Sequence, residues 1–348
     1  MSNIKIQNIY YMLAYAFRVL NEKGYEKIAT EHFEHMAEFC AAILSKGIAN
    51  QIKRGLGREY IRKSDSLSSP HGKMDLSSSI KQQTLLQKRL VCEYDEFSEN
   101  VYINQILKTT ALILIRSAAV SHERKKALKK VMLYFQNVDM LEHRMIRWGG
   151  IRYQRNNATY KMLINICYLV LHGLLLSEQA GVQKLAAYVD DQSMHRLYEK
   201  FILEYYRHHY PALKASPSYV EWDLAEGSLV DFLPAMKTDI TLQYKNDVLI
   251  IDAKYYQKTM QTNKLYDSRT LHSHNLYQIF TYVKNKEAKT VGTVSGALLY
   301  AKTDEAITPD NTYVISGNRI RVQTLDLNAD FSVIRKQLDN LIDDFFQL

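Results

Sequence analysis

A short apolar run that ends in two charged residues constrains the fold of this 348-residue chain more than any other segment. Residues 248–251 read Val-Leu-Ile-Ile, and Asp252-Ala253-Lys254 follow directly. An unbroken apolar run of this length favours a strand buried on both faces, as in the centre of a covered sheet. Because side chains alternate along a strand, Asp252 and Lys254 point to the same side. The sequence therefore predicts a buried sheet with a charged pair at the end of a central strand.

A second apolar-rich run precedes this strand, and the two together predict a β-hairpin. Residues 238–244 and 248–254 are joined by Lys245-Asn246-Asp247. A two-residue turn at Asn246-Asp247 would place Asp239 opposite Lys254 and on the side of Asp252, whereas a three-residue turn would point Asp239 away. Two converging carboxylates repel each other unless a cation lies between them, and oxygen ligands suit Mg²⁺ or Mn²⁺. We therefore expect a hard-metal site that activates a water molecule, with Lys254 assisting.

Asp-x-Lys alone is a short pattern, and on an exposed strand it is usually a solvated pair. The buried setting of this strand favours a functional pair instead, because a buried Asp and Lys need a compensating interaction. A helix is predicted at 274–285, and Gln278 and Tyr282 stand four residues apart on one of its faces. Taken alone, these two are more typical of an ordinary amphipathic helix.

The combination of an acid, a hairpin, Asp-x-Lys and a helical Gln-x-x-x-Tyr resembles the PD-(D/E)XK nuclease superfamily, in particular its RecB-like branch. The resemblance implies that Asp239 and Asp252 bind the metal, that Lys254 is the catalytic lysine, and that Gln278 and Tyr282 support the site. Many relatives also carry an acid on the helix that opens the domain. Glu199 and Glu204 are both candidates for that acid, and the sequence does not choose between them.

Three segments narrow the resemblance to the McrC family, and they lie at 8–17, 250–256 and 273–278. McrC proteins are the endonuclease subunits of McrBC modification-dependent restriction systems. The resemblance implies a Mg²⁺-dependent type IV endonuclease that acts on double-stranded DNA carrying modified cytosine. It also implies that the chain works with, and stimulates, an McrB-like AAA+ GTPase hexamer. The catalytically silent activator and the stand-alone DNA repair nuclease remain alternatives.

The motor activity is expected to belong to the partner. No Gly-x-x-x-x-Gly-Lys-[Ser/Thr] occurs in the sequence, and Gly72-Lys73 is followed by Met74 and lacks the upstream glycine. We therefore expect this chain to bind no nucleotide itself.

The pattern along the chain predicts an α+β protein with two domains. We expect a mainly helical domain at 1–190 with a β insertion near 58–94, followed at 191–348 by a mixed α/β domain of the PD-(D/E)XK, or restriction endonuclease-like, type. By family analogy the first domain docks on the motor, and the insertion offers cations for that contact: Arg58, Arg62, Lys63 and Lys73. In the second domain we expect a helix at 192–208, strands at 218–223, 229–233, 238–244, 248–254, 293–301 and 319–326, and a last helix at 330–346.

Charge and composition agree with a DNA partner without proving one. The formal net charge of +8 favours polyanions. The three cysteines are far apart in sequence, so neither a disulfide framework nor a zinc motif is indicated. No signal-peptide pattern and no long apolar span occur, which predicts a cytoplasmic protein that does not enter a membrane.

Overall fold

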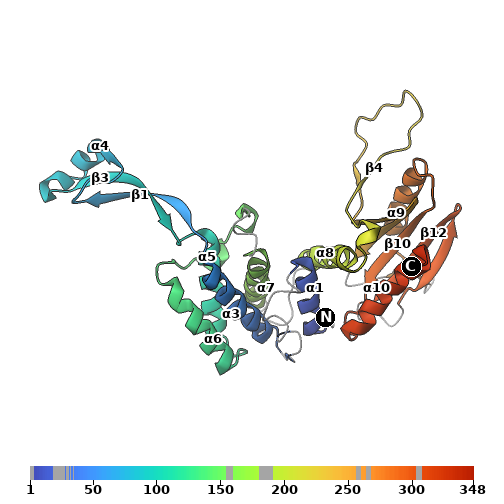
Figure 1. The fold of residues 1–348 in the computed structure, drawn as a ribbon, viewed down its shortest axis with the longest axis horizontal. Helices are drawn as coiled ribbons and strands as arrows, with labels where there is room; N and C mark the ends of the chain where they lie inside the picture. The colour runs from blue at the N-terminus through green and yellow to red at the C-terminus, as the bar shows by residue number, and fades with distance from the viewer. Residues whose placement is uncertain are drawn as a thin grey trace. The chain divides into compact units, whose positions relative to one another are not determined.

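The computed structural model describes residues 4–18, 28, 31, 33, 35–153, 160–179, 191–255, 260–263, 268–302 and 308–348. The chain divides into two compact units, Met1–Glu34 with Ala187–Leu348 and His35–Ala186 (Figure 1). The division predicted at residue 190 is close to this one, although residues 180–190 lie outside the described part. The first 34 residues, however, belong to the C-terminal unit and not to the helical domain predicted at 1–190.

The C-terminal unit is built around a five-stranded mixed sheet. Three neighbouring strands, β7, β10 and β12, run parallel, and the two edge strands are antiparallel to their neighbours. The strands, in spatial order, are β11 (Asn311–Ile315), β12 (Asn318–Leu325), β10 (Val294–Ala301), β7 (Asp247–Lys254) and β6 (Ile240–Tyr244). As predicted, β7 is an interior strand, and its side chains from Val248 to Lys254 are buried.

Helices cover both faces of this sheet. One face packs against α8 (Asp191–His209) and α10 (Phe331–Phe346), with α1 (Ile6–Ala16) packed on α8, and the other face packs against α9 (Ser273–Glu287). The N-terminal segment joins this unit because Met12 and Tyr15 of α1 are buried among the aromatic residues of α8. Gly296 of β10 allows α9 to approach closely, since a Cβ there would lie 2.8 Å from the Ile279 side chain.

Several strands differ from the prediction. The apolar run at 229–233 is an exposed loop, because it lies between β4 (Tyr219–Val220) and β5 (Met236–Lys237), which pair with each other and leave it no partner. Phe232 in this loop has a φ of 68° and is fully exposed. The prediction missed the edge strand β11 and the hairpin of β8 (Met260–Asn263) and β9 (Ser268–Leu271). A short exposed edge strand lacks the apolar alternation that signals a strand in sequence.

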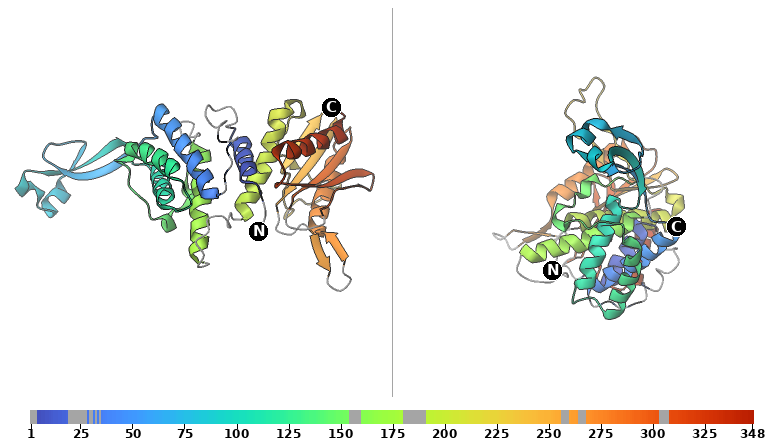
Figure 2. Two further views of the ribbon diagram at one scale, coloured as in Figure 1. Left: turned by 90° about the horizontal axis from the view of Figure 1, so that it is seen from below. Right: turned by 90° about the vertical axis from the view of Figure 1, so that its left-hand side faces the viewer.

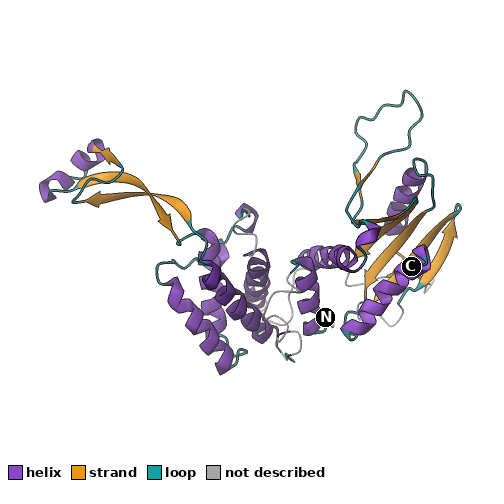
Figure 3. Cartoon of the chain, in the orientation of Figure 1, coloured by secondary structure: helices purple, strands orange, loops and turns teal. Residues whose placement is uncertain are grey.

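The other unit is mainly helical and carries the predicted β insertion (Figure 3). Its strands β1 and β3 pair antiparallel along nine residues each, from Glu59↔Ser98 to Leu67↔Leu90, and form a ribbon that extends away from the helices of this unit (Figure 2). The strands of the insertion are β1 (Glu59–Leu67), β2 (Lys73–Asp75) and β3 (Leu90–Ser98), and its end carries α4 (Leu76–Lys81) and η1 (Thr84–Gln87). The helices of the body are α3 (Met36–Arg54), α5 (Tyr102–Arg116), α6 (His122–Met132) and α7 (Tyr160–Gln179).

Short 3-10 turns complete the described secondary structure: η2 (Leu133–Phe135), η3 (His143–Met145), η4 (Trp148–Gly150) and η6 (Pro211–Leu213). The architecture is α+β, as predicted. Within the described residues, no helix has the length and apolarity that crossing a bilayer requires.

Candidate active site

The hairpin of β6 and β7 positions the predicted acids, but its turn differs from the expected one. The two-residue loop is Lys245-Asn246, closed by the pair Tyr244↔Asp247. Asp247 is not in the turn because its Oδ1 accepts hydrogen bonds from the backbone N and Oγ1 of Thr293, at 2.9 and 2.7 Å. One step beyond the last pair, Ile240↔Ile251, this register places Asp239 opposite Asp252 rather than opposite Lys254. Asp239 remains on the side of Asp252, because the loop still has two residues.

Asp252 is a buried carboxylate, and few interactions compensate for the loss of its hydration. Its relative exposure is 1%, and its Oδ2 lies 2.8 Å from Nζ of Lys254. No described residue gives either of its carboxylate oxygens a well-directed hydrogen bond. Burial raises the pKa of Asp252, and the nearby Lys254 ammonium opposes that shift without cancelling it. The side chain is therefore short of positive charge.

Asp239 is the residue directly before β6, and its carboxylate is also destabilised by burial. Its Oδ2 accepts a hydrogen bond of 2.9 Å from the backbone N of Ala253, which fixes it beside the end of β7. Burial, followed by the negative charges of Asp252 and Glu199, raises the pKa of Asp239 to about 7. The two acids thus act on each other across the hairpin.

Helix α9, which carries the predicted Gln-x-x-x-Tyr pattern, fixes the position of the Lys254 side chain. Its Nζ donates to Oε1 of Gln278 at 3.2 Å, and Nε2 of Gln278 donates to the hydroxyl of Tyr282 at 3.0 Å. Tyr282 is buried in the core between α9 and the sheet. The structure therefore brings together Asp239, Asp252, Lys254, Gln278 and Tyr282.

The two candidate glutamates of α8 have different surroundings. Glu204 is buried and accepts from Arg18 Nε at 2.7 Å and from Arg207 Nη1 at 2.9 Å. Burial alone would raise the pKa of Glu204, but these hydrogen bonds outweigh burial and lower it. Glu199, in contrast, acts electrostatically on both Asp239 and Asp252. The structure thus associates Glu199 with the acid pair, while Glu204 is engaged by two arginines.

His195, which was not predicted as a site residue, stands one helical turn before Glu199. Its Nε2 lies 2.8 Å from Oε1 of Glu199, and its Nδ1 accepts from the backbone N of Tyr255 at 3.3 Å. The hydrogen bond to Glu199 raises the pKa of His195, and burial opposes this shift without cancelling it. The signal available in the sequence was the spacing of four residues, which puts His195 and Glu199 on one helical face.

The donor set fits a hard divalent cation. No group of three or more described His, Cys, Asp or Glu residues is arranged to hold a metal by itself. Mg²⁺, however, is commonly held by one or two carboxylates, with water and substrate phosphate completing its shell. Asp239 and Asp252 can supply those carboxylates, and the Lys254 ammonium beside Asp252 only partly compensates for the burial of that carboxylate. Glu199 adds a third negative charge nearby.

The predicted partner-contact cations lie on the ribbon of the other unit. Three of them form ion pairs with acids of the returning strand or of the residue that follows it: Arg58 with Glu99, Arg62 with Glu93 and Lys63 with Glu96. The fourth, Lys73, is exposed on β2 near the end of the ribbon. These three cations of the ribbon shaft are therefore already paired with acids.

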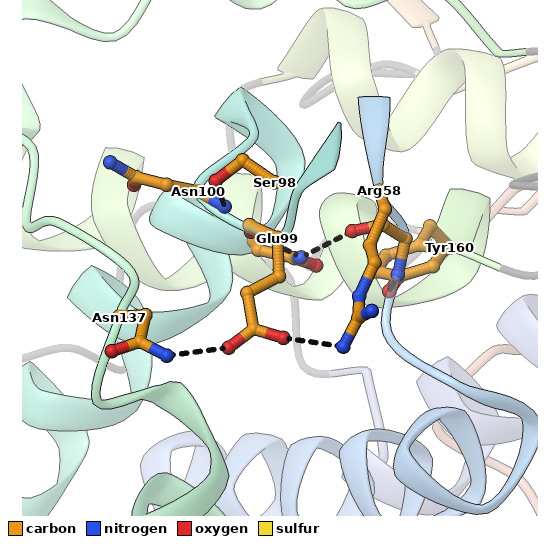
Figure 4. Close-up of polar contacts among 8 residues, drawn as sticks. Arg58, Ser98, Glu99, Asn100, Asn137 and Tyr160 are labelled. Carbon is orange, nitrogen blue, oxygen red and sulfur yellow. Dashed lines mark hydrogen bonds and ion pairs between the residues drawn. The ribbon is translucent and has the colours of Figure 1, made fainter. Parts of the chain in front are cut away.

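A hydrogen-bonded clasp fixes the base of the ribbon to the helical body (Figure 4). The buried Asn104 of α5 donates to the carbonyl oxygens of Gly57 and Glu99, at 2.9 and 2.8 Å, so it links the start and the end of the ribbon. The Gly57 N–H donates to the hydroxyl of Tyr160 on α7 at 2.7 Å, and Arg58 pairs with the Glu99 carboxylate at 3.2 Å. Both strands of the ribbon thus leave the body from fixed positions.

The far end of the ribbon, here called the tip (residues 73–89), is exposed and apolar, which the sequence analysis did not anticipate. Leu86 is 83% exposed and Ile80 is 65% exposed. Further exposed apolar residues and a set of cations surround them: Met74, Leu76, Leu85, Lys73, Lys81, Lys88 and Arg89. An exposed apolar cluster of this kind is typical of a protein-binding surface.

Comparison with known proteins gives matches that span the chain. The family model described as McrBC 5-methylcytosine restriction system component matches residues 3–301. The type IV methyl-directed restriction enzyme EcoKMcrBC of Escherichia coli (strain K12) is 24% identical over 99% of both chains.

Two solved assemblies from Thermococcus gammatolerans are also similar. A half-complex of McrB AAA+ hexamers with bound McrC has a TM-score of 0.49 at 17% identity, covering 97% of this chain and 76% of that chain. The McrBC complex has a TM-score of 0.37 at 18% identity, covering 54% and 61%. The sequence similarity extends along nearly the whole chain, whereas both structural matches have TM-scores below 0.5.

Proposed function

This chain belongs to the family of McrBC 5-methylcytosine restriction system components, and from that premise we propose that it is the DNA-cleaving subunit of such a system, a Mg²⁺-dependent type IV restriction endonuclease. The observation that carries the proposal is the convergence of Asp239, Asp252 and Lys254 at the end of β7. A mixed sheet covered by helices, with this constellation on an interior strand, supports a PD-(D/E)XK nuclease fold.

The residues of the site suit phosphodiester hydrolysis. Asp239 and Asp252 would hold a divalent cation, which would supply the positive charge needed to polarise a phosphoryl oxygen and to acidify the attacking water. Lys254 supplies a fixed positive charge for the phosphate on which negative charge develops. Its position is set from two sides, by Asp252 at 2.8 Å and by Gln278 at 3.2 Å. Tyr282 in turn restrains Gln278, so the ammonium has little freedom to leave the site.

We further propose that an AAA+ GTPase is the partner and that the tip of the ribbon makes the activating contact. The family is that of restriction system components, and the sequence of this chain contains no P-loop motif, so we assign the motor activity to a partner. The tip offers exposed apolar side chains, among them Leu86 and Ile80, whereas the shaft cations are already paired. Double-stranded DNA with modified cytosine is the proposed substrate, since the family is that of 5-methylcytosine restriction systems.

Cleavage of cytosine-methylated plasmid by this chain, mixed with its AAA+ partner, GTP and Mg²⁺, tests the proposal. Asp252→Ala is expected to abolish cutting while GTP hydrolysis by the partner stays stimulated. The matched control is Asp247→Asn, which changes the other carboxylate of β7, at the far end of the strand from the site.

Two outcomes would overturn parts of the proposal. If the wild-type chain stimulates hydrolysis and never cuts, the chain is an activator without nuclease activity. If it cuts unmodified DNA with Mg²⁺ alone, it is a stand-alone nuclease.

A further inference from the structure

His195 is engaged at both ring nitrogens. Its Nδ1 accepts the backbone N–H of Tyr255 at 3.3 Å, and its Nε2 lies 2.8 Å from Oε1 of Glu199. Because the lone pair of Nδ1 is used by the Tyr255 N–H, the ring proton belongs on Nε2, which then donates to Glu199. Neither nitrogen is left to coordinate a metal ion. The geometry therefore separates His195 from the groups that bind the cation directly.

The ring connects two elements of the site. His195 and Glu199 are on α8, and Tyr255 is the residue that directly follows Lys254 at the end of β7. The hydrogen bonds thus set the Glu199 carboxylate relative to the strand that carries Asp252 and Lys254. The charge of Glu199 acts on both Asp239 and Asp252. The side chains of His195 and Glu199 are 31% and 30% exposed, so both remain partly accessible to solvent.

We propose that His195 is a positioning residue that holds Glu199 toward the Asp239–Asp252 pair, so that three negative charges favour one divalent cation. This inference rests on the proposed metal-dependent nuclease function. A merely structural helix pair would stabilise α8 slightly and would leave metal affinity unchanged. Removal of a group that hydrogen-bonds to a metal ligand and orients it typically lowers metal affinity about 10- to 100-fold. The two roles therefore differ in a measurable quantity.

Binding of Mn²⁺ to the full chain, without DNA or partner, tests the proposal, with electron paramagnetic resonance counting the free ion. The amide nitrogen of His195→Gln comes near the position of Nε2 and can donate to Glu199, whereas the amide oxygen of His195→Asn comes near Nδ1 and replaces only the contact with Tyr255. We expect His195→Asn and His195→Ala to weaken Mn²⁺ binding about 10-fold, and His195→Gln to stay within about 3-fold of wild type. If His195→Ala does not fold, the comparison of Gln with Asn decides.

Asp252→Ala, measured in parallel, separates failure of this inference from failure of the proposed function. If Asp252→Ala binds Mn²⁺ as wild type does, the proposed metal site is itself wrong. If Asp252→Ala loses binding and all His195 variants keep it, the positioning role alone is overturned. Equal loss in His195→Gln and His195→Ala also overturns it, because His195 would then be a direct ligand.

Discussion

Charged residues differ in burial and in charge pairing between strand β7 and the β1–β3 ribbon. On β7 the Asp252–Lys254 pair is buried, and Asp239 and Glu199 leave the site with more negative than positive charge. On the ribbon, the cations of the shaft are solvent-accessible and each meets an acid, as Arg62 meets Glu93. A buried imbalance of charge is costly and invites a cation, whereas exposed matched pairs contribute little to stability and attract no ligand. This difference supports our proposal that the catalytic site lies at the sheet and the partner-binding surface at the tip of the ribbon.

The largest expected effect comes from removing the buried cation. Lys254→Met should lower the DNA cleavage rate about 10³-fold, because a fixed charge at the phosphate is lost. It should also lower the free energy of unfolding by about 3 kcal/mol at pH 8, since it leaves the Asp252 carboxylate buried without its partner. Plasmid cleavage and urea unfolding measure the two effects. Unchanged stability would mean that the pair is not energetically coupled.

The pH dependence of stability tests the imbalance directly. Because the pKa of Asp239 is raised to about 7, the folded state binds more protons than the unfolded state between about pH 4 and pH 7. The stability of the metal-free chain should therefore fall as pH rises through this window, by on the order of 2 kcal/mol or more. Asp239→Asn should flatten that slope, and Mg²⁺ should stabilise wild type more at pH 8 than at pH 6. Thermal unfolding at several pH values provides the measurement, and identical slopes in the two proteins would contradict it.

Strand β7 and its Asp252–Lys254 pair could be predicted because the pattern that indicates them lies within one short segment. An unbroken apolar run predicts a buried strand, and because side chains alternate along any strand, Asp252 and Lys254 must point to the same side. The turn could not be read in the same way, since Asp247 is drawn into β7 by Thr293, 46 positions further along. The close approach of Gly292 to the carbonyl of Asn246 adds to this non-local constraint.

The choice between the two glutamates was non-local as well. Glu204 and Glu199 both have helical spacings compatible with a site, and only the folded chain shows that Arg18, from the segment after α1, engages Glu204. The loop at 229–233 has the apolar composition of a strand, yet it lacks a strand to pair with. Composition reports the preference of a segment, whereas pairing depends on its neighbours.

The clasp at the base of the ribbon gives the next effect in size. Asn104→Ala removes donors from two carbonyl oxygens and should lower the free energy of unfolding by about 2–3 kcal/mol. It should also weaken stimulation of the partner GTPase while Mn²⁺ binding at the sheet is unchanged. Asn137→Ala is the matched control, because Asn137 is exposed and its bond to Glu99 is long, at 3.4 Å. Equal losses in both variants would argue against a role for the clasp.

The tip should respond in binding and not in stability. Leu86→Ser is expected to weaken stimulation of the partner roughly tenfold, as removal of an apolar anchor from an interface does. Because Leu86 is 83% exposed, the melting temperature should not change. Leu229→Ser, at 84% exposure in the other unit, controls for the loss of an exposed leucine. A titration of partner GTPase activity against each variant measures the effect, and a normal curve for Leu86→Ser would exclude this part of the tip.

The smallest effect is expected at the ribbon pair that forms the counterpart of Lys254–Asp252. Arg62→Met should change the free energy of unfolding by less than about 1 kcal/mol, because the Arg62 side chain is 70% exposed and its pair with Glu93 is screened by water. Stimulation of the partner should also stay within about twofold of wild type, since the charge is already balanced by Glu93. A much larger loss of stimulation, with stability intact, would mean that the partner draws Arg62 away from Glu93. The shaft cations would then be contact residues, as the family resemblance suggested, and balanced charge on a strand would no longer distinguish a structural pair from a binding site.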